Sequence, residues 1–491
     1  MDYKKLAELL FPDNKLTVEE IEKQYKKRDL KTGAEVTRFA PSPTGYMHLG
    51  GFFQALIDCN IAKHSGGVFY LRIEDTDQKR EIAGASAIVM GILHDYDLMP
   101  DEYQLKGGVT VGDYGPYYQS ERVEIYKAYA KKLVSEGKAF PCFCRKTEGF
   151  SDVLENREKK FAVGIIEEKD SCRNLTIEQI EQNLKDGKKF AIRLKSANDG
   201  THKIKLHDYL RGEIDIQENS KDAILLKDNL IPTYHFAHAI DDTLMGTTTV
   251  IRGEEWIASY PLHKEIFDAL GFVQPKYIHS PLLYKFDEQG NKIKLSKRKH
   301  PEADMRYFDK EGYVKQAIVE YLFNIINSNF EVWRKNNPLA DLSEFPFDGF
   351  NITANTPIFD MIKLNDISKD IISRFSAEKC YRELLNWAKE FSLENVDYLI
   401  KDKEYVTKVL NIDREKPKPR KDIFKWSMFF DLFDYMFGAP KSFELDAGEQ
   451  KEFENVIRNY KDYLDLSSKE TWFEKVKEMA GKLGYATDNK D

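Results

Sequence analysis

The sequence predicts an α/β protein in which a parallel sheet precedes an all-helical C-terminal region. Short β-prone segments alternate with helix-prone segments over residues 36–118, the pattern of βαβ units that form a parallel sheet. The same alternation returns over residues 232–300. Beyond Pro301 long, aromatic-rich helical segments dominate and no clear βαβ unit remains, which favours a helical C-terminal region.

The first βαβ unit follows a short pair of leading helices. Its strands are expected at Val36–Phe39 and Val68–Ile73, both short and β-prone. Apolar residues at helical spacing predict the helix between them: Phe52, Phe53, Leu56, Ile57 and Ile61. A further helix is expected from Arg80 to about Tyr96. This order suggests that the two strands lie in a parallel sheet.

The middle of the chain is interpreted as an insertion into this α/β region. A charged amphipathic helix is expected over residues 120–136, and a mixed region rich in lysine and glutamate continues to about Asn229. After it, the segment 232–242, a strand at Thr248–Arg252 and a helix at Trp256–Leu270 return to the α/β pattern. The long helices expected further on are Tyr313–Asn327, Ala377–Phe391 and Phe424–Phe437.

Length and composition limit the classes of protein. A chain of 491 residues and 57.1 kDa is expected to form two to four domains. It has no run of about eighteen apolar residues, which excludes a membrane-spanning helix. Five cysteines, an odd number in a long chain, indicate the thiols of a cytoplasmic protein. The net charge of −8 argues weakly against a nucleic-acid partner, but several basic clusters leave room for a polyanion on one face.

The stretch from Thr37 to Gly51 is expected to form a strand-to-helix corner that binds phosphate. It contains two prolines, three glycines and a histidine. A glycine-containing corner that opens a helix lets the backbone approach a phosphate and directs free N–H groups at it. His48, at the start of the helix, adds a donor for a phosphoryl oxygen. The alternative is an ordinary βα turn capped by a histidine.

A second basic cluster is Lys292–Lys299, in which five of eight residues are cationic. Two lysines flank a serine there, Lys294 and Lys297. Positioned cations of this kind suit a polyphosphate that gains charge in a transition state. Taken alone, the cluster could equally be a solvated basic loop.

The two clusters together resemble the two signatures of class I aminoacyl-tRNA synthetases. Five motifs in the same order resemble the glutamyl-tRNA synthetase family: Arg38–Gly45, Leu71–Asp77, Pro232–Ala237, Val250–Trp256 and Lys294–Arg298. The helical C-terminal third matches the bacterial branch, whose anticodon domain is helical.

The resemblance implies a Rossmann-like catalytic domain with an inserted α+β domain, followed by an all-α anticodon-binding domain. The expected boundaries, in order, are an N-terminal helical extension (1–35), the first half of the catalytic domain (36–118), an acceptor-stem-binding insertion (119–231), the second catalytic half with the lysine loop (232–300), a stem-contact region (301–350) and the anticodon-binding domain (351–491).

The resemblance also implies the reaction. A glutamate–tRNA ligase activates L-glutamate with ATP and Mg²⁺, then transfers glutamate to the 3′-terminal adenosine of tRNA(Glu). No covalent enzyme intermediate is needed, so catalysis depends on positioning and charge stabilisation. The implied protein is a cytoplasmic monomer without a membrane partner.

Site residues follow from the same resemblance. Catalytic roles are expected for His48, Lys294 and Lys297. The residues expected to bind ATP are Thr44, His48, Gly50, Gly51, Glu255, Lys294, Leu295, Ser296, Lys297 and Arg298. The residues expected to bind glutamate are Arg38, Ala40, Ser42, Glu74, Tyr234, His238 and Arg252.

The charges of these residues match those of glutamate. Arg38 and Arg252 offer guanidinium forks for two carboxylates, and which arginine binds which carboxylate stays open. Glu74 is expected to bind the α-ammonium. Arg72 and Asp75 are instead interpreted as a structural ion pair.

His238 departs from the family pattern, because members usually carry asparagine there. Histidine can still donate a hydrogen bond, and a protonated histidine would favour an anionic side chain. Activity should survive, while the choice between glutamate and related amino acids stays open.

Three cysteines, Cys142, Cys144 and Cys172, resemble the start of a zinc knuckle found in some members. The fourth ligand would stand two residues after the third, where this chain has Asn174. Structural zinc sites normally close with four nitrogen or sulfur ligands, so zinc is not expected. His202 and His207 are possible substitutes for the fourth ligand, but their spacing from the cysteines does not point to them.

Two other functions stay open. A non-discriminating enzyme would also glutamylate tRNA(Gln). A catalytically inactive paralog would act as a binding protein, although the intact phosphate corner and lysine loop argue against it. The long C-terminal region argues against a short paralog that modifies a tRNA base.

Overall fold

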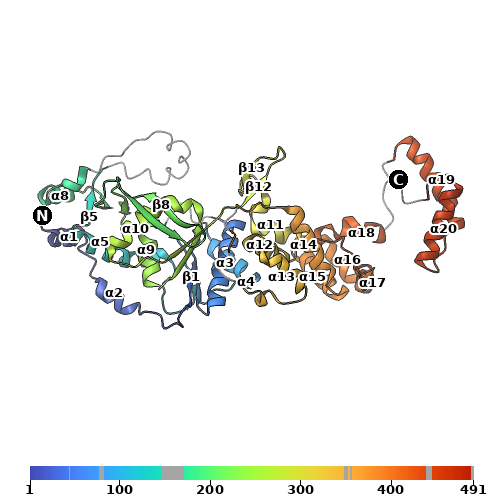
Figure 1. The fold of residues 1–491 in the computed structure, drawn as a ribbon, viewed down its shortest axis with the longest axis horizontal. Coiled ribbons are helices and arrows are strands. Elements are labelled where there is room, and N and C mark those ends of the chain that lie inside the picture. The colour runs from blue at the N-terminus through green and yellow to red at the C-terminus, as the bar shows by residue number, and fades with distance from the viewer. Residues whose placement is uncertain are drawn as a thin grey trace. The chain divides into compact units, whose positions relative to one another are not determined.

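The computed structural model of the protein describes residues 1–43, 45–76, 82–144, 171–347, 352–353, 356–437 and 445–487. The chain divides into two compact units, Met1–Ser427 and Met428–Asp491. Figure 1 shows the elements coloured in chain order. Within the described ranges, no helix is both long and apolar enough to span a membrane.

The first predicted βαβ unit is present, and Figure 1 labels its first strand β1 and its helix α3. β1 (Val36–Phe39) and β2 (Val68–Leu71) pair in parallel, and α3 (Leu49–Ser65) connects them. All four residues of β1 are buried, as expected for a strand covered on both faces. The helix expected from Arg80 is α4 (Ala85–Asp95), which starts after a left-handed glycine at its N-cap.

The second βαβ unit repeats this arrangement. β10 (Thr249–Gly253) and β11 (Lys276–Ser280) pair in parallel, and α10 (Tyr260–Leu270) lies between them in the chain. The helix predicted at Trp256–Leu270 is confirmed only in its second part. Its first part is the 3₁₀ helix η4 (Glu254–Ser259), which precedes α10.

A backbone hydrogen bond of 3.0 Å from the Thr248 amide to the Val36 carbonyl joins the two units. β7 (Lys203–Asp208) extends the second unit by a parallel pairing with β11, and β8 (Gly212–Gln217) is antiparallel to β7. The resulting strand order is β10–β11–β7–β8. A hairpin from the expected inserted segment therefore lies in the same sheet as the second βαβ unit.

The rest of the inserted segment forms a small antiparallel sheet with helices. The sheet has the order β5 (Ala139–Cys142), β6 (Ala191–Leu194) and β9 (Ile224–Leu226). The helix predicted at residues 120–136 is confirmed as α5 (Val123–Ser135), preceded by the 3₁₀ helix η1 (Gln119–Arg122). The further elements are η3 (Ser171–Asn174) and α8 (Ile177–Lys185).

The N-terminal segment packs into the hydrophobic core formed by helices of the α/β region and the inserted segment. α1 (Tyr3–Leu10) starts at the side-chain cap Asp2, and α2 (Val18–Gln24) starts at a capping box on Thr17. Leu6, Leu10 and Ile21 are buried in one cluster with apolar residues of α5, α10 and α9 (Tyr234–Leu244). The leading helices therefore brace the α/β region.

The described residues beyond Pro301 form no strand of their own. The long helices predicted there appear as α12 (Lys315–Ile326), α15 (Ala377–Phe391) and α18 (Phe429–Phe437). The other elements are η5 (Pro301–Ala303), α11 (Met305–Glu311), α13 (Asn329–Asn336), η6 (Leu342–Glu344), α14 (Met361–Ser373), η7 (Leu393–Asn395), α16 (Val396–Lys401), α17 (Lys403–Asn411), η8 (Trp426–Met428), α19 (Ala447–Tyr463) and α20 (Lys469–Lys482).

Candidate active site

A cavity of about 290 Å³ lies where β1 and β10 end and α3 begins. This is the edge of a parallel sheet at which ligands usually bind, because the carboxyl ends of the strands open there. Nine residues predicted to bind substrate lie on its wall: Arg38, Ala40, Ser42, His48, Gly51, Glu74, Tyr234, Arg252 and Lys297.

His48 caps a helix and also lines the cavity, so the capped-turn interpretation and the ligand-binding interpretation of the corner both apply to it. It is the N-cap of α3, and its Nδ1 accepts a hydrogen bond of 2.8 Å from the Gly50 amide. Burial, helped by the nearby Lys297 charge, lowers the pKa of His48 to about 4. The ring is therefore neutral near pH 7, and because Nδ1 accepts from Gly50 the proton lies on Nε2.

The lysine loop follows a hairpin of β12 (Tyr284–Phe286) and β13 (Lys292–Lys294). Lys297 reaches the cavity and donates to the Tyr46 carbonyl. Burial lowers the pKa of Lys297. Lys294 does not line the cavity, but its charge also helps to lower the pKa of His48, so both lysines lie near the corner.

Two buried arginines share one aspartate beneath the cavity. Asp242 accepts from Arg38 Nε at 3.2 Å and from Arg72 Nη1 at 2.6 Å. Burial disfavours charge on all three side chains, but their attraction outweighs it. The attraction between the opposite charges raises the pKa of both arginines and holds the pKa of Asp242 well below its usual value.

The ion pair expected between Arg72 and Asp75 is wrong. Arg72 pairs with Asp242 and with Glu74, whose Oε1 lies 3.1 Å from Arg72 Nη2. Asp75 instead accepts from the amide and the hydroxyl of Ser120, at 2.8 and 2.6 Å. Side chains alternate between the two sides of an extended backbone, so Arg72 and Glu74 share one side after β2 and Asp75 lies on the other. Arg72 and Asp75 therefore meet different partners.

Glu74 lies on the cavity wall, where the nearby arginines only partly offset the cost of burying its carboxylate. Burial raises its pKa to about 7, although Arg72 and Arg38 pull it down. A cationic ligand group would stabilise the carboxylate, so this position suits an ammonium.

His238 does not reach the cavity, contrary to the expected direct contact. Its ring is fully buried and stacks on Tyr234, with centroids 5.2 Å apart, and its Nδ1 lies 3.0 Å from Asp242. Burial lowers its pKa to about 4, so His238 is neutral near pH 7. Tyr234 stands on the cavity wall in front of it.

Other predicted ATP-binding residues do not line the cavity. Leu295 is buried, and the Ser296 amide donates to His300 Nδ1 at 3.1 Å. A side chain at Gly253 would collide with the Glu255 carboxylate, so that glycine keeps room for it. Also outside the wall are Gly50, Glu255, Lys294 and Arg298. Thr44 lies outside the described residues.

Several cavity residues were not predicted. Gln54 and Asp58 on α3 and Trp256 on η4 line the wall, while Asp242 lies beneath it. Both Asp58 carboxylate oxygens are buried and lack a hydrogen-bond partner in the described part of the chain. An aspartate between apolar residues of a buried helix face was a usable signal, and so was the Asp241–Asp242 pair.

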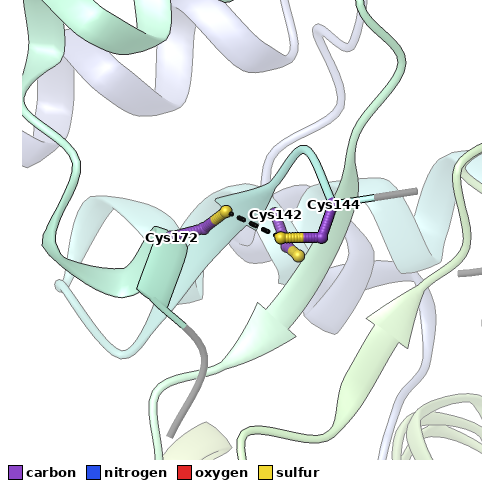
Figure 2. Close-up of side chains that lie close together, drawn as sticks. All are labelled: Cys142, Cys144 and Cys172. Carbon is purple, nitrogen blue, oxygen red and sulfur yellow. Dashed lines mark hydrogen bonds between the residues drawn. The ribbon is translucent and has the colours of Figure 1, made fainter. Parts of the chain in front are cut away.

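The three cysteines come together, as Figure 2 shows. Their sulfurs lie within 4.8 Å of one another, and Cys144 Sγ is 3.4 Å from Cys172 Sγ. Over residues 1–144 and 171–487, apart from the short gaps, no histidine, cysteine or carboxylate completes the group. His202 lies beside Asp199 and Glu218 instead, and His207 beside Glu213. The described residues thus supply three ligands where structural zinc needs four.

Comparisons with known proteins agree with this geometry. Residues 35–331 match the family described as tRNA synthetases class I (E and Q), catalytic domain. The chain is 43% identical over 500 residues to a glutamate–tRNA ligase of Clostridium perfringens strain 13, covering 100% of this chain and 91% of that one. It is 42% identical to a glutamate–tRNA ligase of Acetivibrio thermocellus, covering 100% and 90%.

A solved structure is also similar. It is a glutamate tRNA ligase from Elizabethkingia meningosepticum in complex with its amino acid. The TM-score is 0.71 at 26% identity, over 92% of this chain and 91% of that one.

Proposed function

Because the chain belongs to the glutamate–tRNA ligase family of class I tRNA synthetases, we propose that it attaches L-glutamate to tRNA(Glu). Glutamate attacks the α-phosphorus of ATP, which arrives with its Mg²⁺ as substrate, to give glutamyl-adenylate and pyrophosphate. The acyl group then passes to a ribose hydroxyl of the 3′-terminal adenosine. The chain's residues bind and orient both reactants, and no side chain becomes covalently attached.

The observation that carries this proposal is the distribution of charge around one cavity. Arg38, Arg252 and Glu74 stand on its wall and complement two carboxylates and one ammonium. His48 and Lys297 stand on the same wall and suit phosphate oxygens. A cavity of about 290 Å³ that presents both sets of groups can hold an amino acid against the α-phosphate.

The residue roles follow from this distribution. Glu74 binds the α-ammonium, Tyr234 donates to a carboxylate, and His238 supports Tyr234 from behind. Lys297 neutralises the leaving pyrophosphate, with Lys294 and Arg298 beside it on the loop. Glu255 contacts the ATP side.

The same proposal covers the rest of the chain. The expected domains bind the acceptor stem through residues 119–231 and the anticodon through residues 351–491. We expect a cytoplasmic monomer. Zinc is not part of the proposal, since the described cysteines offer three ligands, and metal analysis of the purified protein tests this.

Aminoacylation of purified tRNA(Glu) and tRNA(Gln), each with glutamate or glutamine, tests the proposal. We expect glutamate to be attached to tRNA(Glu) and no product with glutamine. Attachment of glutamine would refute the assignment of the amino acid. Charging of tRNA(Gln) with glutamate would identify the non-discriminating form, and no charging of either tRNA would leave the inactive paralog.

A loop variant tests the phosphate side. Lys297→Ala is expected to lower kcat by about 100-fold or more, because it removes a cation that acts on the charge of the transition state. Lys299→Ala is a matched control on the same loop and is expected to act like the wild type. Equal rates for both variants would overturn the role of Lys297.

A further inference from the structure

Arg252 is held by two histidines instead of a carboxylate. Its Nε lies 3.0 Å from His279 Nε2, and its Nη1 lies 2.9 Å from His263 Nδ1. Arg38 and Arg72, by contrast, both pair with Asp242. Arg252 forms no ion pair within the described part of the chain, so its charge is not compensated there.

The hydrogen bonds determine where the two histidines carry their protons. A guanidinium only donates hydrogen bonds, so the histidine nitrogens facing Arg252 must both accept. Neutral His279 then carries its proton on Nδ1, which lies 2.7 Å from Asp208 Oδ2. Neutral His263 carries its proton on Nε2, which lies 2.8 Å from His235 Nδ1.

Burial keeps both rings in this neutral form. It lowers the pKa of His263 far below its usual value, with the charges of nearby histidines and Arg252 acting in the same direction. It also lowers the pKa of His279, against the opposing effect of Asp208. A neutral ring is required, because a protonated ring would oppose a donor with a donor.

The third nitrogen of Arg252 makes no hydrogen bond in the described part of the chain. Nη2 is buried and has no hydrogen-bond partner among the described residues, although Arg252 stands on the cavity wall. An unpaired buried guanidinium nitrogen is costly unless a ligand completes it. An anionic ligand group fits this position better than an amide, because the local charge is positive and uncompensated.

We propose that His263 and His279, the latter backed by Asp208, are positioning residues that hold Arg252 ready for a carboxylate of the amino-acid substrate. The inference rests on the proposed function for the identity of that substrate. Asp208 ends β7 in the expected inserted segment, so this segment helps to shape the amino-acid site. Neither histidine touches substrate; each acts through Arg252.

Paired variants of the full-length protein separate positioning from packing. His263→Asn keeps an acceptor near the position of Nδ1, and His279→Gln keeps one near Nε2, whereas leucine at either position keeps bulk without an acceptor. His94→Asn, at an exposed position on α4, is the matched control. The readouts are KM for glutamate, KM for ATP, kcat and the melting temperature.

We expect the leucine variants to raise KM for glutamate by about 10- to 100-fold, the usual cost of a lost hydrogen bond to a charged group. KM for ATP should change by less than about twofold, and the acceptor-keeping variants should recover most of the loss. Unchanged KM for glutamate in folded leucine variants would overturn the proposal. So would equal losses in the leucine and acceptor-keeping variants.

A measurement on the unaltered protein covers the case in which the leucine variants do not fold. NMR of ¹⁵N-histidine-labelled protein reports which ring nitrogen carries each proton. The expected protons lie on His279 Nδ1 and His263 Nε2, and the opposite tautomer of either ring would overturn the proposal. Because no substrate is needed, this result is independent of whether the wild type charges tRNA.

Discussion

Individual side chains near the cavity depend strongly on one another, because their charges are buried together. Asp242 serves Arg38, Arg72 and His238 at once. Removing one partner of such a buried set leaves the others uncompensated, which costs more than the isolated contact contributes. Glu74 and Asp58, the two carboxyl groups on the cavity wall whose pKa burial raises, are therefore the informative residues to change.

Glu74→Gln should weaken glutamate binding by about 10- to 100-fold, because the amide loses the charge that attracts the ammonium. The wild-type carboxyl has a pKa of about 7 before substrate binds, so affinity should rise between about pH 6 and pH 8 as Glu74 loses its proton. The variant has no such group and should lack this rise. Calorimetric titration with glutamate at several pH values measures both, and a variant with the wild-type pH dependence would contradict the role.

Asp58→Asn should stabilise the protein, and more so at higher pH. Burial raises the pKa of Asp58 well above its ordinary value of 3.8, so the folded protein keeps a proton that the unfolded chain releases. The associated stability is fully present below the ordinary pKa and is lost as pH rises through the folded pKa. We expect a gain of about 1–3 kcal/mol at alkaline pH.

Thermal unfolding of Asp58→Asn at two pH values checks this expectation. Asp29→Asn changes an exposed aspartate and serves as the control. A stability difference between Asp58→Asn and the wild type that does not vary with pH would show that Asp58 is already ionised in the folded protein.

Single elements agree well with expectations where local signals are strong. β1 and α15 have the predicted bounds, since apolar pattern and caps lie within each segment. The exceptions include helix starts: α4, α10 and α18 begin later than predicted. A 3₁₀ turn has nearly the same apolar spacing as an α-helix, so η4 was not distinguishable from the start of α10.

The turn between α3 and β2 shows how closely two elements can approach. A Cβ on Gly67 would lie 1.8 Å from the Glu35 carbonyl oxygen, which accepts from the Val68 amide. Gly67→Ala should therefore displace β2 from the segment before β1 and cost about 3 kcal/mol or more. Gly66→Ala meets open space but needs a φ of 68°, and should cost about 1–2 kcal/mol.

Melting temperatures of the two glycine variants compare these costs. The pair is matched, because the residues are neighbours and both changes add one methyl group. Equal losses would mean that backbone strain alone, without steric contact, limits this turn.

The whole molecule consists of two compact units, to which the proposed function assigns different tasks. All described cavity residues belong to the unit Met1–Ser427, and Met428–Asp491 forms the second unit. A chain ending at Ser427 should keep its affinity for glutamate, whereas KM for tRNA should rise, because part of the proposed anticodon domain is missing. Loss of glutamate binding in this variant would contradict the division of tasks.

Removal of residues 1–24 should have the opposite outcome. α1 and α2 bury Leu6, Leu10 and Ile21 in the central core, and each large apolar side chain removed from a core costs about 2–5 kcal/mol. We expect a protein that no longer folds, measured by circular dichroism and thermal unfolding. A variant with the wild-type melting temperature would show that the leading helices are dispensable.

The function and the order of the elements could be predicted from the sequence, because the motifs and patterns that indicate them are each contained in a short segment of the chain. The phosphate corner, the lysine loop and the strand and helix patterns each lie within one segment, and the order of the motifs carries the resemblance to glutamyl-tRNA synthetases that predicted the function. The partners of the site residues could not be predicted. Arg38 and Asp242 are 204 positions apart in the chain, and Asp208 and His279 are 71 apart. The burial that shifts the pKa of Glu74 and His238 arises only when these distant segments pack together, because desolvation depends on all surrounding atoms. The same packing places His238 behind Tyr234.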